Sequence, residues 1–340
     1  MRAIVFHRPG SFSLEEVPDP VPGPREVLVR VEAVGICGTD IHVLDGEFAP
    51  TRYPIIPGHE TSGIVEAVGE KVSEVAVGDP VSVDPTLTCG ECGYCSVGRS
   101  NLCEQWNGAG VARTNGSTAE LTVAPVRNVH RLPDGVDLAL AALIEPLSCA
   151  IHGYDLLPRR MGEHYLVYGA GTMGLMMAQL APRAGAASVT VIDRNPARLA
   201  AARDVGIERA ALSADDADYR GGWDVVIDCT GVVAAIEDGL SRVRRGGVFQ
   251  QFGVAATAAT ARFSPFAVYN DEITVVGSMA VLASYARAVE MFAAGALRAE
   301  RMVSHAYALD DYGDALRTFR AGTGRKLQVR PQASSSHQLL

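Results

Sequence analysis

Short runs of apolar and β-branched residues fill the first third of the chain, and clusters of proline and glycine separate them. Such runs lie at 27–34, 63–68 and 80–83, and the segment 18–24 contains four prolines. Alternation of apolar and polar positions is typical of strands with one buried face, and proline clusters end such strands. The pattern predicts an all-β, barrel-like domain.

The pattern changes at about residue 165 to mainly apolar runs that alternate with glycine turns and helical periodicity. These runs lie at 166–168, 189–192, 224–227, 247–252 and 273–276. Apolar strands joined by helices are typical of a parallel sheet that is covered on both faces. We therefore predict a second domain of α/β class with a doubly wound parallel sheet.

The segment after residue 282 returns to elements without a nucleotide motif. It predicts a helix at 285–294, a strand near 305–309 and a second helix at 310–320. Residues 332–340 are rich in serine and predict a disordered tail. A length of 340 residues exceeds one ordinary core, so we expect two domains with a cleft between them.

Composition excludes several classes of function. The net charge of −9 gives no general attraction to nucleic acid or anionic lipid. Hydrophobic residues make up 48% of the chain, but no apolar run approaches the length of a membrane span. The first residues lack the apolar core of a secretory signal, so we expect a cytoplasmic protein.

Four of the seven cysteines fall within one fifteen-residue stretch, and this spacing predicts a structural zinc site. Cys-x-x-Cys loops suit a tetrahedral metal with zinc–sulfur distances of about 2.3 Å better than they suit disulfides. Gly90, Gly93 and Gly98 supply the freedom for successive turns. A site closed by four thiolates leaves no position for a substrate, so the chemistry must lie elsewhere. The ligands would be Cys89, Cys92, Cys95 and Cys103.

A glycine motif between a predicted strand and a predicted helix indicates a dinucleotide site. In the motif at 169–174 the first glycine makes the turn, the second lets a pyrophosphate approach and the third lets helix and strand pack closely. Asp193 ends the next strand, where it would bind the adenosine ribose and favour NAD, whereas the neighbouring Arg194 keeps NADP open. The predicted cofactor residues are Gly169, Gly171, Thr172, Met173, Gly174, Asp193 and Arg194.

A thiolate, an imidazole and two carboxylates predict a second, catalytic zinc. A catalytic zinc takes three protein ligands and keeps one exchangeable position. We assign Cys37 and His59 as the first two of these ligands. The third ligand is Glu60 or Glu145, and the sequence leaves this choice open. The total prediction is two zinc ions per chain.

The ordered motifs resemble the zinc-dependent medium-chain dehydrogenase/reductase family over essentially the whole chain. They are C-G-T-D-x-H at 37–42, G-H-E-x-x-G-x-V-x-x-x-G at 58–69, the cysteine cluster and the glycine motif with its aspartate. The resemblance implies a GroES-like catalytic domain at 1–150 with a zinc lobe at about 85–107. It also implies a Rossmann domain at 151–281, a return to the catalytic domain at 282–331, and homodimers or homotetramers. Pro80 departs from the family, which usually has arginine in this turn.

Glu145, in a position where alcohol dehydrogenases carry a cysteine ligand, points to the polyol and sorbitol branch of the family. More narrowly, the chain is similar to the dehydrogenases of aminoglycoside antibiotic biosynthesis that oxidise a ring hydroxyl of the aminocyclitol 2-deoxy-scyllo-inosamine to a ketone, on the route to 2-deoxystreptamine. Sorbitol, threonine and other secondary alcohols are the alternative substrates.

The predicted mechanism ionises a hydroxyl on the open zinc position, because zinc lowers the pKa of bound water from about 15.7 to about 7. Thr39 would take the proton and pass it by way of the cofactor ribose toward His42, while the substrate carbon gives hydride to the nicotinamide. Glu60 is the third predicted catalytic residue. Thr39 as a helix cap and His42 as a surface residue are the alternatives. Substrate contacts are expected from Phe48, Arg52, Tyr53, Trp106 and Asn107.

Two other classes of protein compete with this interpretation. A zinc-stapled binding module would share the cysteine cluster, but the acidic balance and the glycine motif speak against it. A zinc-free quinone reductase should lack both Cys37 and the cluster. The remaining Cys149 and Cys229 are interpreted as small core residues.

Overall fold

The computed structural model describes residues 1–48, 50–217, 219 and 221–340, which form two compact units. The first unit contains Met1–Ser148, Val281–Gly295 and Val303–Leu340. The second contains Cys149–Ala280 and Ala296–Met302.

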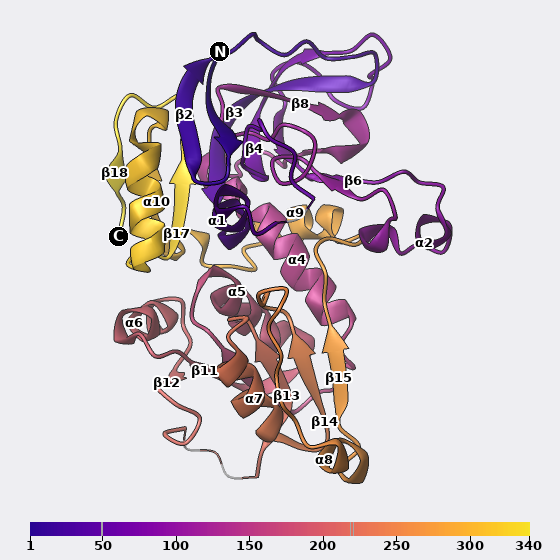
Figure 1. Cartoon of the computed structure of the whole chain (residues 1–340), viewed down its shortest axis with the longest axis vertical. Helices are drawn as coiled ribbons and strands as arrows, with labels where there is room; N and C mark the ends of the chain where they lie inside the picture. The colour runs from indigo at the N-terminus through magenta and orange to yellow at the C-terminus, as the bar shows by residue number, and fades with distance from the viewer. Residues whose placement is uncertain (49, 218, 220) are drawn as a thin grey trace. The chain divides into compact units, whose positions relative to one another are not determined.

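An eight-stranded sheet forms the centre of the first unit (Figure 1). Its order is β18-β16-β17-β3-β4-β5-β9, and β8 pairs with β3 as well. The strand β3 (Glu26–Ile36) shows why the sequence folds this way, because Val27, Val29 and Val31 are buried while the residues between them are partly exposed. Two-stranded sheets formed by β1 with β2 and by β6 with β7 complete the β-structure of the unit.

The remaining strands of the first unit are β1 (Arg2–Arg8), β2 (Ser11–Glu16), β4 (Glu60–Val68), β5 (Pro80–Val83), β6 (Thr86–Leu87), β7 (Asn107–Gly108), β8 (Leu121–Pro125), β9 (Val129–Arg131), β16 (Val303–Tyr307), β17 (Lys326–Val329) and β18 (His337–Gln338). Its helices are α1 (Gly38–Asp45), α2 (Gly93–Ser96), α3 (Leu138–Ala141), α9 (Tyr285–Ala293) and α10 (Tyr312–Ala321). The helix α4 (Ile144–Asp155) contains the division between the units.

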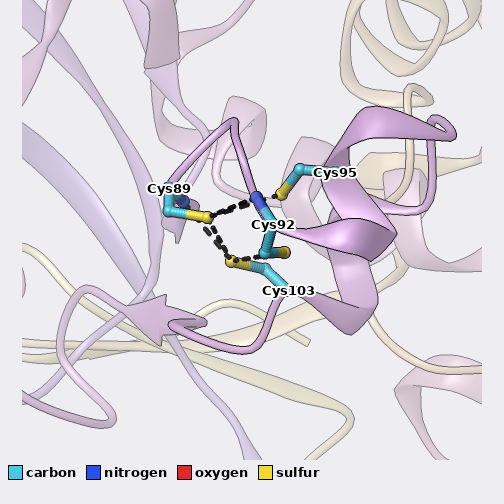
Figure 2. Close-up of side chains that lie close together, drawn as sticks. All are labelled: Cys89, Cys92, Cys95 and Cys103. Atoms are coloured by element: carbon cyan, nitrogen blue, oxygen red, sulfur yellow. Dashed lines mark hydrogen bonds between the residues drawn. The ribbon is translucent and has the colours of Figure 1, made fainter.

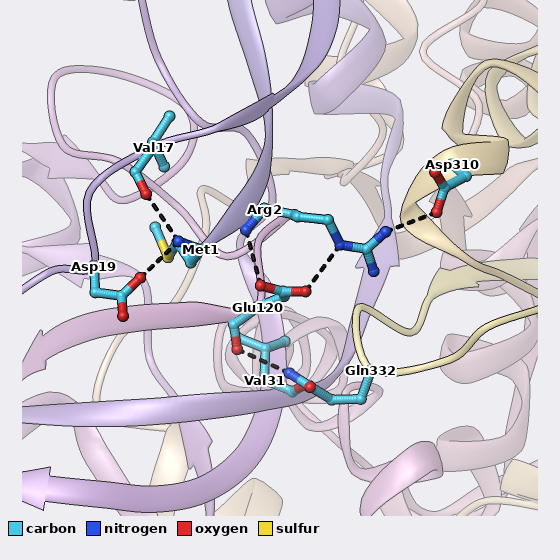
Figure 3. A network of polar contacts seen from close by, with 8 residues as sticks. All are labelled: Met1, Arg2, Val17, Asp19, Val31, Glu120, Asp310 and Gln332. Carbon is cyan, nitrogen blue, oxygen red and sulfur yellow. Dashed lines mark hydrogen bonds and ion pairs between the residues drawn. The ribbon is translucent and has the colours of Figure 1, made fainter.

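A polar network joins the start of the chain to its last segment within the first unit (Figure 3). Arg2 donates from Nε to Glu120 Oε1 and from Nη1 to Asp310 Oδ2, both at 2.9 Å. Gln332 donates from Nε2 to the carbonyl oxygen of Glu120 at 3.0 Å. The C-terminal segment is therefore attached to the β-rich unit, although more than a hundred residues of the second unit separate them in sequence.

The second unit is built on a six-stranded, wholly parallel sheet in the order β12-β11-β10-β13-β14-β15 (Figure 1). Its central strands are buried apolar runs, as expected where helices cover both faces. The strands are β10 (Glu163–Tyr168), β11 (Ala186–Ile192), β12 (Arg209–Ala211), β13 (Trp223–Asp228), β14 (Val243–Gln251) and β15 (Thr274–Gly277). The helices are α5 (Thr172–Leu180), α6 (Pro196–Asp204), α7 (Val233–Ser241) and α8 (Pro265–Asn270).

This strand order is that of the doubly wound dinucleotide-binding fold, so the predicted fold class is confirmed. The helices predicted near 285–294 and 310–320 are observed as α9 and α10, and the strand predicted near 305–309 is observed as β16.

The structure differs from the sequence prediction in two segments. The tail at 332–340 was expected to be disordered, but β18 pairs antiparallel with β16 and Leu339 N donates to Ser304 O at 2.8 Å. The exposed backbone of β16 thus offers hydrogen bonds that order the tail, and the polar composition of the tail gives no sign of them. The segment Ala296–Met302 was assigned to the catalytic domain, but it packs with the second unit, where Arg298 N donates to Gln179 Oε1 at 2.8 Å.

Among the described residues, no helix has both the length and the apolar character that a membrane span requires.

Candidate functional site

Three of the predicted catalytic zinc ligands meet at one end of the β3–β4 pair. The strand β3 ends one residue before Cys37, and β4 begins with Glu60 directly after His59. Because Gly35 pairs with Glu60 in the antiparallel register, the two strand ends lie together. A sulfur, an imidazole nitrogen and a carboxylate oxygen of Cys37, His59 and Glu60 lie within 4.8 Å of one another.

Asp40 orients this group from the first turn of α1. Its Oδ2 accepts the N–H of Cys37 at 2.8 Å, and its Oδ1 accepts the N–H of Gly58 at 3.3 Å and lies 3.4 Å from His59 Nδ1. Burial alone would lower the pKa of His59, but Asp40 and Cys37 raise it well above its ordinary value. A carboxylate behind a histidine is the usual support of a metal-binding imidazole. Sequence reasoning missed this role, although the aspartate belongs to the quoted motif.

Glu60 has a second partner, Lys326 on β17. Lys326 Nζ donates to Glu60 Oε1 at 2.6 Å and to the carbonyl oxygen of Ile36 at 3.0 Å, and it also contacts Glu60 Oε2. The two side chains are 3% and 1% exposed. Burial lowers the pKa of Lys326, but Glu60, Cys37 and Glu145 together raise it above its ordinary value. No sequence motif singled out this lysine, which is the first residue of β17.

The donor set fits zinc. Thiolate, imidazole and carboxylate are the ligands that zinc takes in proteins. Within the described part of the chain, the buried atoms His59 Nδ1 and Glu60 Oε2 form no hydrogen bond of regular geometry, and their charged neighbours are the Asp40 carboxylate and the Lys326 ammonium. The other candidate third ligand, Glu145, is buried near the start of α4 and lies outside the group of three.

The residues of the predicted proton path both lie on α1. Thr39 Oγ1 is 3.6 Å from Cys37 Sγ, next to the candidate metal site. His42 is partly exposed, and its Nδ1 lies 2.7 Å from Glu47 Oε2. The capping carboxylate of this helix belongs to Asp40, so Thr39 is not needed as the cap.

The predicted substrate contacts occupy three kinds of position. Tyr53 donates to the carbonyl oxygen of Val43, and Asn107 Nδ2 donates to Thr114 Oγ1 at 2.7 Å, so both hold loops. Phe48 and Trp106 pack edge to face with ring centres 6.4 Å apart. Arg52 is exposed, and its backbone N–H donates to Ala112 O.

The four clustered cysteines point toward a common centre (Figure 2). Their sulfur atoms lie within 4.8 Å of one another, with separations of 4.0, 3.9 and 3.4 Å for three of the pairs. A regular tetrahedron of zinc–sulfur bonds of about 2.3 Å has edges of about 3.8 Å. Gly90 and Gly98 have the left-handed φ expected for these turns, whereas Gly93 has an ordinary φ and begins α2.

Backbone groups prepare the cluster for a cation. The N–H groups of Cys92 and Gln105 donate to Cys89 Sγ and Cys103 Sγ, each at 3.3 Å. Backbone hydrogen bonds lower the pKa of Cys92 to about 6, while burial and the neighbouring thiols raise the pKa of Cys95 to about 12. Four thiolates this close together repel one another, so full ionisation requires a metal ion at the centre.

The glycine motif of the second unit follows β10 and opens α5. Gly169 has a φ of +96°, and a Cβ on Gly174 would overlap the carbonyl oxygen of Gly169. A Cβ on Gly171 would meet no atom within 4 Å, which leaves open space at the N-terminus of the helix. This is the arrangement that a pyrophosphate needs, and Thr172 and Met173 form the first turn behind it.

Asp193 stands beside this turn at the end of β11. Its Oδ2 accepts the N–H of Ala170 and its Oδ1 that of Asn195, both at 2.8 Å. Arg194 is exposed, and Arg198 Nη1 lies 3.7 Å from the Asp193 carboxylate. In a doubly wound dinucleotide-binding fold, the end of this strand is where an adenosine ribose is bound.

A further carboxylate at a strand end was missed by sequence reasoning. Asp228 ends β13, is fully buried, and accepts the N–H groups of Thr230 and Gly231 at 3.1 and 2.9 Å. Gln251 donates to the same carboxylate at 2.9 Å. Asp228 thus holds the loop after β13, whose Thr230 lies next to Gly169.

Comparisons with known proteins agree with both units. Residues 23–134 match the alcohol dehydrogenase GroES-like domain, and residues 172–294 match the zinc-binding dehydrogenase family. The chain is 34% identical to D-arabinitol dehydrogenase 1 of Uromyces fabae, with 97% of each chain covered. It is 33% identical to a sorbitol dehydrogenase of Halalkalibacterium halodurans, with 97% of this chain and 99% of that one covered.

A solved structure shares the whole fold. It belongs to a protein from Sinorhizobium meliloti 1021 described as a zinc-binding dehydrogenase and is bound to NADP. The TM-score is 0.92 at 33% identity, with 97% of this chain and 99% of that one covered.

The chain belongs to the zinc-dependent medium-chain dehydrogenase/reductase family, in its polyol dehydrogenase branch. It is an NAD(P)-dependent alcohol or polyol dehydrogenase.

The two candidate metal sites predict different effects of two cysteine substitutions. Cys103→Ala should lose one zinc per chain and lower Tm by about 10 °C or more, because the bound zinc holds the loops of the zinc lobe together. Cys37→Ala should also lose one zinc, but with little change in Tm and with loss of alcohol oxidation. Elemental analysis and thermal unfolding of both variants measure these effects. Full turnover by Cys37→Ala would contradict the ligand assignment.

Two glycine substitutions in the motif should affect different properties, one the binding of the cofactor and the other the stability of the fold. Gly171→Ala should leave Tm unchanged, because the new Cβ meets no protein atom, but should weaken NADH binding by about tenfold or more by blocking the pyrophosphate. Gly174→Ala should lower Tm by about 5 °C through overlap with the backbone of Gly169. Fluorescence titration with NADH and thermal unfolding test both variants. Unchanged NADH affinity in Gly171→Ala would place the cofactor elsewhere.

Proposed function

We propose that the protein oxidises a secondary hydroxyl of a polyhydroxylated ring, and specifically that of an aminocyclitol such as 2-deoxy-scyllo-inosamine, in aminoglycoside antibiotic biosynthesis. The observation that carries the dehydrogenase chemistry is the group of Cys37, His59 and Glu60 with ligand atoms within 4.8 Å. The sequence resemblance to aminocyclitol dehydrogenases supports the narrower substrate. A cytoplasmic location belongs to this proposal, because the clustered thiolates need a reducing compartment.

The net charge of the chain supports a cationic substrate. Asp40, Glu60 and Glu145 are three buried carboxylates, which Lys326 and a bound zinc ion would largely offset. The net charge of the whole chain, −9, favours the approach of an amine. An uncharged polyol would gain nothing from this excess.

In this proposal, Cys37 and His59 hold the catalytic zinc together with Glu60 or Glu145, and the four clustered cysteines hold the structural zinc. When bound, the catalytic zinc would lower the pKa of a substrate hydroxyl, and the nicotinamide would take up the hydride. Thr39 Oγ1, 3.6 Å from Cys37 Sγ, would accept the hydroxyl proton and release its own toward His42. His42, partly exposed and 2.7 Å from Glu47, would pass that proton to water.

Oxidation of an acyclic polyol is the second candidate. The relatives named above act, according to their names, on D-arabinitol and sorbitol, and each is matched over nearly its whole length. The same ligand set would serve this reaction, so only the substrate preference separates the two candidates.

Turnover of a substrate panel tests the choice. With NAD or NADP and the zinc-loaded enzyme, 2-deoxy-scyllo-inosamine should give a kcat/KM at least about tenfold above those of sorbitol, D-arabinitol and L-threonine, as expected for about 1.4 kcal/mol of charge recognition. The absorbance of the reduced cofactor measures each rate. A tenfold preference for any of the other three substrates would reject the aminocyclitol.

We also propose a homodimer formed through the edge of the parallel sheet. Within the described residues, β15 is the last strand of its sheet and pairs only with β14. Val275 on this strand is exposed, as are Phe266 and Tyr269 of the preceding helix α8. An exposed apolar edge strand is a typical site for strand pairing between two chains.

Val275→Lys should therefore convert the dimer to a monomer, because the new charge would have to be buried in the paired edges. Light scattering after size-exclusion chromatography measures the mass. Val21→Lys, at an exposed valine of the other unit, is the matched control and should remain dimeric. A monomeric wild type or a dimeric Val275→Lys would contradict this interface.

A further inference from the structure

The C-terminal end of helix α1 brings the side chains of His42 and Glu47 together. Gly46 follows the helix with a left-handed φ of +78°, and its N–H donates to Val43 O at 3.1 Å. The next N–H, that of Glu47, donates to His42 O at 2.8 Å. These two hydrogen bonds define a Schellman motif, in which a side chain of the last helical turn lies beside the first side chain after the glycine. Here the two are an imidazole and a carboxylate, with His42 Nδ1 2.7 Å from Glu47 Oε2.

The turn that holds this pair is fixed by its backbone and its packing. A Cβ on Gly46 would come within 2.7 Å of Pro9 Cγ, so both the φ and the space at this position require glycine. Gly10, between β1 and β2, donates from its N–H to Leu44 O at 2.6 Å and ties the hairpin to the last turn of the helix. The geometry of the pair therefore does not depend on the ion pair itself, which is weak at an exposed position.

The other charged groups at this end of the helix leave Glu47 to His42. Arg320 on α10 donates from Nη2 to Asp45 Oδ1 at 2.6 Å. This hydrogen bond raises the pKa of Arg320, and Glu47 adds a weaker electrostatic attraction. Asp45 thus occupies the guanidinium that could otherwise draw the Glu47 carboxylate away. Within the described part of the chain, His42 is the one side chain that shares a hydrogen bond with Glu47.

The pair determines which ring nitrogen of a neutral His42 carries hydrogen. An ionised carboxylate can only accept a hydrogen bond, so Nδ1 beside Glu47 must be the protonated nitrogen. Nε2 then has the free lone pair, and it forms no hydrogen bond with any residue that the structure describes. Thr39 precedes His42 by three residues, so the two lie on the same side of α1. The nitrogen that remains open on this side of the relay is therefore Nε2.

We propose that Glu47 is a positioning residue for proton release: it keeps hydrogen on Nδ1 of neutral His42, so that Nε2 receives the proton released through Thr39. The proposal rests on the alcohol oxidation proposed above. An O–H bond breaks as the N–H bond forms at Nε2, and the Glu47 carboxylate stabilises the resulting imidazolium. Transfer of the Nε2 proton to water restores the neutral ring with hydrogen on Nδ1. The electron pair of the substrate C–H bond leaves separately, as the hydride.

Nuclear magnetic resonance of the full-length, zinc-loaded protein tests the tautomer without any turnover. Protein with ¹⁵N-labelled histidine gives distinct signals for protonated and unprotonated ring nitrogens, and loss of signals in His42→Gln assigns those of His42. At a pH where the ring is neutral, the wild type should have hydrogen on Nδ1. Glu47→Leu removes the acceptor and should shift the population toward hydrogen on Nε2. Glu47→Gln retains an acceptor oxygen and should keep the wild-type tautomer.

Steady-state kinetics of the same variants connect the tautomer to the reaction. With the alcohol of the panel above that the wild type oxidises fastest, Glu47→Leu should lower kcat about threefold or more and leave KM within about twofold, because proton release is slowed while substrate binding is unchanged. Glu47→Gln should restore most of the lost kcat. Glu74→Leu removes an exposed glutamate that pairs with Arg25 elsewhere in the same unit, and this matched control should equal the wild type in both measurements.

Three results separate the proposal from the function on which it rests. Hydrogen on Nε2 in the wild type, or the same tautomer in Glu47→Leu as in the wild type, would overturn the proposal. A shifted tautomer with unchanged kcat would overturn the role of Glu47 in the reaction and leave the alcohol oxidation intact. A zinc-loaded wild type that oxidises no alcohol of the panel would reject the proposed function, and this role of Glu47 with it.

Discussion

The antiparallel register of β3 with β4 is the constraint on which the candidate metal chemistry of this protein depends. It sets Gly35 opposite Glu60, so the turn that holds Cys37 and the turn that holds His59 lie at the same end of two hydrogen-bonded strands. A shift by one residue would move Glu60 to the other face of the sheet and separate the donor set. On its other side β3 pairs with β17, which brings a lysine from the end of the chain to the same carboxylate.

The second unit places its polar groups by the same rule, with parallel strands in place of antiparallel ones. The glycine turn, Asp193 and Asp228 follow β10, β11 and β13, and the carboxyl ends of neighbouring parallel strands meet at one edge of the sheet. The buried strands supply stability, and the loops after them are free to carry the residues that bind a dinucleotide. Both units therefore place candidate chemistry at strand ends that the hydrogen-bond ladder holds in position.

Burial of the candidate ligand groups determines their affinity for a cation. Two arrangements of side chains favour a bound cation: four thiols within 4.8 Å of one another, and a second group of a thiol, an imidazole and a carboxylate. Little solvent and few other positive charges surround these groups, so their negative charge is not otherwise compensated. Asp40 and Lys326 are the residues that complete the second group, one behind His59 and one against Glu60. Membership of the zinc-dependent polyol dehydrogenases agrees with this chemistry, and the choice among alcohols lies in side chains around the metal rather than in the fold.

Local patterns in the chain were enough to predict what depends on neighbouring residues. The cysteine spacing, the glycine turn with Asp193 and the alternation along β3 each belong to one short segment, and the corresponding elements and clusters were predicted from them. Contacts between distant segments were beyond such reasoning. The pairing of Lys326 with Glu60, the strand formed by His337–Gln338 and the packing of Ala296–Met302 on the second unit depend on strand register and on backbone groups left open by other elements. These are properties of the assembled sheets, because hydrogen bonds between residues far apart in the sequence leave no periodic pattern in the chain.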